Sequence, residues 1–132
     1  MQQLVYVSSA ARGAAAGDIA SILEVSRRNN RAQGLTGMLY ADQRRFLQVL
    51  EGETTNVEAA FKRIERDPRH RAVVVLSRRA VTEREFGAWE MAHAAPGHDG
   101  DALLARVEAL TAAASPAVRA TFAGFVEARR AA

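Results

Sequence analysis

In this 132-residue chain, one candidate for holding a ligand is a glutamine in the middle of an apolar run. Gln48 lies in FLQVLEG, residues 46–52, and its neighbours on both sides are apolar, as in a buried strand. A buried amide without partners costs on the order of 1–3 kcal/mol. Gln48 therefore needs hydrogen-bonding groups, either from the fold or from a bound molecule.

Other polar side chains are predicted to lie in the same layer as Gln48. Tyr6 and Ser8 share one face of an alternating segment, and Asn29-Asn30 end a predicted helix. If these faces point at the helices, a phenol, a hydroxyl and amides line a slot. Its apolar walls would be Ile22 and Ile64, facing each other from two helices. The slot suits a planar guest with heteroatoms along one edge.

Each of these residues also has an ordinary interpretation. A buried glutamine can be satisfied by the core, Tyr6 can be a half-buried tyrosine, and Asn29-Asn30 can form a helix C-cap. The pattern of residue types leaves the ligand site and the ordinary core both open.

Hydrophobic periodicity predicts the elements that position these residues. Strands are expected at residues 2–8, 34–41, 45–52, 72–77 and 86–91, and helices at 18–30 and 54–67. Thr55 and Glu58 have the spacing of a capping box, and Pro68 ends the second helix. The continuous β-branched run AVVVLS, residues 72–77, predicts a central strand or one buried on both faces.

The order βαββαββ predicts a ferredoxin-like α+β sandwich. Two crossovers of one hand place both helices on the same face of a five-stranded mixed sheet. After residue 96 come two alanine-rich amphipathic helices, and Pro116 suits the first position of the second one. We expect this tail to serve packing or oligomerisation.

Composition indicates one globular domain, with 48% hydrophobic and 25% charged residues. No apolar run of membrane-spanning length and no leader is present, and cysteine is absent, so the cytoplasm is expected. The pI of 10.2 reflects arginine content, because the net charge is only +3. The basic stretch 62–79 therefore predicts a solvated face rather than a nucleic-acid surface.

Catalytic and metal-binding patterns are not apparent in the sequence. His93 and His98 lie five residues apart without a carboxylate-rich partner set, so no metal site is expected. Neither a nucleophile–base pair nor a glycine-rich phosphate loop is recognisable, so the chain is not expected to be an enzyme.

Six motifs in a fixed order resemble the BLUF family of blue-light sensors that use flavin. The resemblance runs from about Leu4 to Met91 and consists of LVYVSS, SRRNN, GLTGMLY, FLQVLEG, FKRIERDPRH and REFGAWEM. It implies a flavin-binding photosensor domain in residues 1–95 and a helical extension for packing, oligomerisation or output in residues 96–132. Short, stand-alone members carry no fused effector, so a homo-oligomer or a partner protein in trans is implied.

The resemblance also implies FAD as the cofactor and names its contacts. Its ring would lie between Ile22 and Ile64, with Asn30 at the pyrimidine edge and Gln48 bridging Tyr6 to the edge near N5 and O4. The implied cofactor-binding residues are Tyr6, Ile22, Asn29, Asn30, Phe46, Gln48, Arg63, Ile64, Asp67, Arg69 and His70. The implied photochemical switch consists of Tyr6, Gln48, Ser8, Trp89 and Met91, and whether Trp89 or Met91 lies beside Gln48 stays open.

Our mechanistic hypothesis is a hydrogen-bond switch. Tyr6 is the nearest phenol able to give an electron and a proton to an excited flavin, and their return would leave Gln48 rotated or tautomerised. The strand carrying Trp89 and Met91 would relay the change to the C-terminal helices.

Two other functions occur on the same fold. An acylphosphatase-like hydrolase needs an arginine in the loop after the first strand, where Arg12 lies, and an asparagine on a strand, whereas Asn29-Asn30 is at a helix end. An RNA-recognition module displays aromatic residues on the open sheet face, whereas Tyr6 and Phe46 would face the helices.

Overall fold

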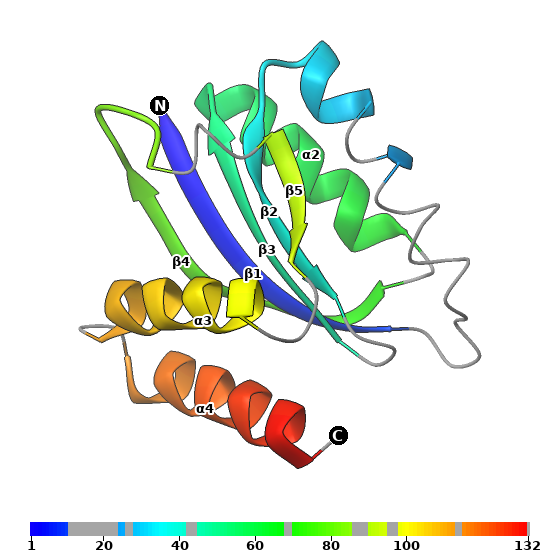
Figure 1. The fold of residues 1–132 in the computed structure, drawn as a ribbon. Helices are drawn as coiled ribbons and strands as arrows, with labels where there is room; N and C mark the ends of the chain where they lie inside the picture. Colours follow the sequence, from blue (N-terminus) through cyan, green and yellow to red (C-terminus); the bar gives the residue numbers. More distant parts are fainter. Residues whose placement is uncertain are drawn as a thin grey trace.

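The computed structural model describes most of the chain as a five-stranded sheet with helices on both faces (Figure 1). The described residues are 1–10, 24–25, 28–41, 45–67, 70–85, 90–94, 98–112 and 115–131. The elements are β1 (Gln2–Ala10), β2 (Thr36–Ala41), β3 (Arg45–Gly52), α2 (Thr54–Arg66), β4 (His70–Ala80), β5 (Glu90–Ala94), α3 (His98–Thr111) and α4 (Pro116–Ala131).

The strand order β4-β1-β3-β2-β5 confirms the ferredoxin-like fold. β1 pairs antiparallel with both β3 and β4, and β2 pairs antiparallel with β3. β5 lies parallel to β2 at the opposite edge from β4, so the sheet is mixed as predicted. The predicted fifth strand at 86–91 begins at Glu90, and residues 86–89 lie outside the described part of the chain.

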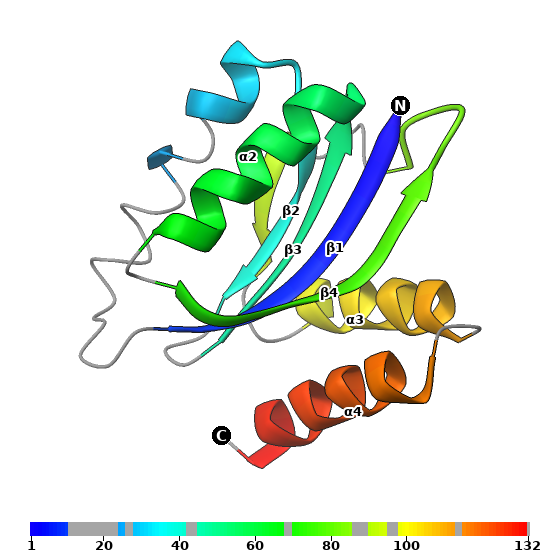
Figure 2. The ribbon, with the colours of Figure 1, turned by 180° about the vertical axis from the view of Figure 1, so that it is seen from behind.

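Period-two alternation along β1 and β3 sends their side chains into two separate cores. Toward α2 lies one buried cluster, formed by Leu4, Tyr6, Leu35, Leu39, Phe46, Leu50, Val57, Ala60 and Phe61. Toward α3 and α4 lies the other, which includes Val5, Val7, Met38, Tyr40, Leu47, Val49, Leu103, Val107, Phe122 and Phe125. The helical residues 28–32 lie on the α2 side of the sheet, whereas α3 and α4 cover the other face (Figure 2). The C-terminal tail therefore packs directly on the sheet.

α2 begins differently from the prediction. Its N-cap is Glu53 without a side-chain capping bond, so the capping box of Thr55 and Glu58 was wrong. Glu58 is used across the fold instead, because its carboxylate accepts from Gln2 Nε2 at 2.8 Å and pairs with Arg78 at 3.1 Å. The helix ends at Arg66, before the proline of the sequence.

β4 is an edge strand and is not buried on both faces, so the prediction of a central or doubly buried strand for residues 72–77 was wrong. Val74 is 37% exposed, and Val73 and Val75 are only partly buried. The pairing of β4 with β1 shifts register between Val5 and Tyr6 and again between Val7 and Ser9. Such bulges and the charged residues of the strand protect an open edge, which the β-branched run does not reveal.

Ala72 in β4 has a φ of 51°, the left-handed region that disfavours side chains. We expect Ala72→Gly to raise the free energy of unfolding by about 0.5–1 kcal/mol, since relief of this strain exceeds the added chain entropy. Urea unfolding measures it. Ala80→Gly on the same strand is the control and should destabilise, because glycine there relieves no left-handed strain. Equal effects of the two substitutions would contradict the strain at Ala72.

Candidate functional site

Tyr6 and Gln48 form a hydrogen-bonded pair inside the sheet–α2 layer. They lie directly opposite each other on β1 and β3, and their side chains are 0% and 2% exposed. The Tyr6 hydroxyl donates to Gln48 Oε1. Directly opposite residues on one face of an antiparallel pair are close enough for this contact. The buried phenol of Tyr6 therefore satisfies part of the hydrogen-bonding capacity of the Gln48 amide.

The environment keeps Tyr6 protonated. Burial raises the pKa of Tyr6 far above its ordinary value, and the nearby carboxylate of Asp67 raises it further. A phenol with a raised pKa keeps its proton throughout the physiological range, so it acts as a hydrogen-bond donor to Gln48.

Apolar groups surround this pair. The Phe61 ring lies 5.6 Å from the Tyr6 ring at an interplanar angle of 55°. Phe46 is fully buried in the same cluster, and Ile64 of α2 packs against it. Ser8 is buried one alternation beyond Tyr6 and pairs with Phe46 across the strands. The low polarity of this layer strengthens the Tyr6–Gln48 bond.

Asn30 is a second buried amide, and it lies on the helical segment 28–32. Its side chain is 5% exposed and makes no hydrogen bond with the described residues. Such an amide is free to meet the edge of a bound molecule. Asn29 precedes it and is partly buried.

The helix carrying Asn30 ends further along the chain than predicted. Gly34 takes a left-handed φ of 66°, its N–H donates to Arg31 O at 3.3 Å, and Leu35 N–H donates to Asn30 O at 2.8 Å. These two bonds define a Schellman motif with Gly34 at its glycine position. The prediction that Asn29-Asn30 end the helix was therefore wrong, because residues 31 and 32 are still helical.

Two side chains of α2 fasten this helix end. Asn56 Nδ2 donates to Gln33 O at 3.1 Å, and Arg63 donates to Gln33 Oε1 at 3.0 Å. Arg63 is exposed at this point rather than buried in the layer. Sequence spacing carries no signal for Gln33 or Asn56, because both contacts cross between elements.

The structure brings together a large part of the expected site. Tyr6, Ser8, Phe46, Gln48 and Ile64 lie in the layer between the sheet and α2, with Asp67 at the end of α2. Ile22, Arg69 and Trp89 lie outside the described residues. His70 and Met91 belong to β4 and β5 by their backbone, but their side chains are not described. The choice between Trp89 and Met91 stays open.

Comparison with known proteins identifies this architecture. Residues 1–92 match the family model for BLUF, sensors of blue-light using FAD. A photoactivated adenylate cyclase subunit beta-like protein of Euglena gracilis is 34% identical over 73 residues, which are 55% of this chain and 8% of that protein.

Solved structures agree with the family match. BlrB, a BLUF protein in its dark state, superposes with a TM-score of 0.71 at 27% identity, covering 93% of this chain and 96% of that one. A bacterial light-regulated adenylyl cyclase superposes with a TM-score of 0.69 at 30% identity, covering 83% of this chain but only 32% of the cyclase. The chain thus corresponds to a small part of the cyclase relatives.

This is a light-sensing flavoprotein domain by its fold and its match. The chain belongs to the BLUF family. Its cofactor is accordingly FAD, and residues 1–92 form a blue-light sensor domain, as the motifs in the sequence predicted. None of the helices in the described ranges is long and apolar enough to cross a membrane.

Proposed function

We propose that this chain senses blue light through a hydrogen-bond switch at Tyr6 and Gln48. One observation carries the proposal: a buried phenol donates to a buried amide inside a BLUF fold. The signal would pass through β5 and the C-terminal helices to a second copy of the chain or to a partner protein in trans. We place this activity in the cytoplasm, which agrees with the cysteine-free sequence.

The residues available fit a flavin. A flavin ring is apolar on its faces and carries amide-like donors and acceptors along one edge, so apolar walls and amides match it. In this proposal Asn30, with Asn29 beside it, and Gln48 meet the ring edge. The walls and the outer contacts of FAD are assigned to Ile22, Phe46, Ile64, Arg63, Asp67, Arg69 and His70.

When bound, FAD supplies blue-light absorption and, in its excited state, a strong oxidant. The work of the protein is to hold one oxidisable phenol beside one reorientable amide. Tyr6 would be the group that gives an electron and its hydroxyl proton to the excited cofactor, and both would return to Tyr6 afterwards. Gln48 is left rotated or tautomerised, with Ser8 supporting the network.

The altered amide must bias a neighbouring element to become a signal. β5 carries Met91. It pairs with β2, and β2 pairs with β3, so one strand lies between β5 and the strand that carries Gln48. The reoriented amide would change the surroundings of Trp89 or Met91. Because α3 follows β5 in the order of elements, a shift of β5 would be passed to α3. No RNA or membrane partner is part of this proposal.

An absorption spectrum of purified, FAD-loaded protein before and after blue light tests the function. We expect a yellow protein whose flavin bands shift reversibly to longer wavelength, and sizing in both states would detect assembly. A protein that stays colourless with ample FAD, or is yellow but unchanged by light, would contradict the proposal.

Asn30 provides a separate test of the binding site. Asn30→Ala removes an amide assigned to the ring edge, and we expect the Kd for FAD to rise by about tenfold, the equivalent of one good hydrogen bond. Gln2→Ala is the matched control, since the Gln2 amide bonds Glu58 at the far end of β1. Fluorescence titration measures both. Unchanged binding by Asn30→Ala would remove Asn30 from the site.

A further inference from the structure

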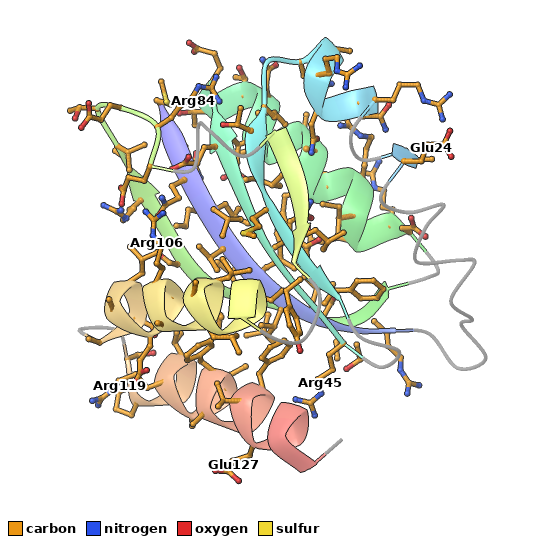
Figure 3. All side chains as sticks on the ribbon, viewed as in Figure 1. Glu24, Arg45, Arg84, Arg106, Arg119 and Glu127 are labelled. Atoms are coloured by element: carbon orange, nitrogen blue, oxygen red, sulfur yellow. The ribbon has the colours of Figure 1, made fainter. Side chains whose placement is uncertain are left out.

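Two adjacent residues after β4, Arg84 and Glu85, contact five other parts of the fold. We call them the Arg84–Glu85 bridge. Figure 3 shows Arg84 near the end of the sheet where β1 begins, and Arg106 on α3 beside β4. The bridge has no role in the switch described above, yet its two residues make hydrogen bonds to β2, β3, α3 and the Gly34 helix end.

Arg84 binds the end of the helix that carries Asn30. Its guanidinium donates to Gly34 O at 2.6 Å, to Thr36 Oγ1 at 2.6 Å and to Glu51 O at 2.9 Å. Gly34 is the glycine of the Schellman motif that ends this helix. The planar fork of arginine can satisfy several acceptors at once, which fixes the helix end to β2 and β3.

Glu85 contacts β3 and α3. Its N–H donates to Glu51 Oε2 at 3.0 Å, and its carbonyl oxygen accepts from Arg106 of α3 at 3.2 Å. The Glu51 carboxylate is fully buried and also accepts from Gln3 Nε2 at 2.7 Å. Arg79 pairs with the Glu85 side chain. The backbone of Glu85 is therefore fixed between the buried side chain of Glu51 and the C-terminal helix α3.

We propose that the Arg84–Glu85 bridge couples the Asn29-Asn30 helix end to α3, in parallel with the route through β5. Arg84 is then a positioning residue for the flavin contacts. Arg106 is the residue through which a change at the Asn29-Asn30 helix end reaches α3. The inference rests on the proposed function. A displacement of Gly34 acts on Arg84, and the covalently adjacent Glu85 carries it to Arg106. Two sites that bias one bonded element are coupled reciprocally.

The rate of dark recovery after a blue pulse tests the coupling in the full FAD-loaded chain. Arg106 is not among the residues assigned to flavin binding. A change of the recovery rate in Arg106→Ala therefore reports coupling rather than the loss of a direct contact with the flavin. We expect about a two- to tenfold change, the usual range for a coupling residue. Arg119→Ala, which removes an exposed arginine from α4, is the control and should recover within about twofold of wild type.

A double-mutant cycle separates the bridge from unrelated effects. Arg84→Ala should change recovery more than Arg106→Ala, and the double variant should behave as Arg84→Ala, because one route cannot be broken twice. Arg84→Lys keeps the charge but lacks the fork, so we expect an intermediate rate, and it serves where Arg84→Ala does not fold.

Wild-type recovery in Arg106→Ala, or strictly multiplicative effects of the two substitutions, would overturn the coupling while leaving the sensor function standing. A wild-type protein that shows no light response would instead contradict the proposed function, and the coupling with it.

Discussion

Tyr6→Phe is expected to abolish the reversible red shift of the flavin spectrum while FAD stays bound. The substitution removes only the hydroxyl that donates to Gln48 and leaves the ring contact with Phe61 at 5.6 Å intact. Phenylalanine offers neither an ionisable proton nor an easily oxidised ring at that position. Light-minus-dark difference spectra on FAD-loaded protein measure the result.

Tyr40→Phe is the matched control for this experiment. Tyr40 is equally buried, but it lies in the other core, where its ring packs edge-on against Phe125 at 5.7 Å. Loss of its hydroxyl should leave the light response in place. Gln48→Glu should behave as Tyr6→Phe, because a carboxylate has no amide group to reorient. A wild-type red shift in either site variant would refute the switch.

Gly37→Ala is expected to destabilise the fold by about 3 kcal/mol or more, a large share of the 5–15 kcal/mol typical of a domain. Gly37 lies in β2 opposite Leu50 of β3, with a φ of 155°. A Cβ at this position would lie 1.8 Å from Val49 O and 2.8 Å from its carbonyl carbon. These are backbone atoms of the neighbouring strand, so β2 and β3 must move apart. Urea unfolding measures the loss.

Gly124→Ala is the control for an added methyl group. Gly124 lies inside α4, and its Cβ would meet nothing within 4 Å. Alanine in a helix interior should stabilise by about 0.5–1 kcal/mol. The two substitutions add the same atoms, so opposite signs would assign the damage to the β2–β3 contact. A Gly37→Ala protein as stable as wild type would show that the strands can separate at low cost.

Local patterning determined the side of the sheet on which the switch lies. Alternation along β1 placed Tyr6 and Ser8 on one face, and alternation along β3 did the same for Phe46 and Gln48. A shift of one residue would send a strand's apolar set to the wrong core, so the register is strongly constrained. The Tyr6–Gln48 contact itself was predicted only through the resemblance to the BLUF family, and the pairing of β1 with β3 accounts for it.

Periodicity was a poorer guide at β4 and at the helix end. The run at residues 72–77 has the composition of a central strand, but its place at the edge depends on which strands the crossovers leave unpaired. The helix continues past Asn30 because Gly34, four residues on, takes the left-handed conformation that closes a Schellman motif.

By itself the sequence determined the elements, the faces of β1 and β3, and the motif set that marks a BLUF protein. Only the tertiary structure decided that α3 and α4 pack on the face opposite α2, and that Arg84 and Glu85 join Gly34 to Arg106. The reason is sequence separation. A period reports which face of an element is apolar, whereas the partner of that face and of each polar side chain is chosen when segments far apart in the chain meet.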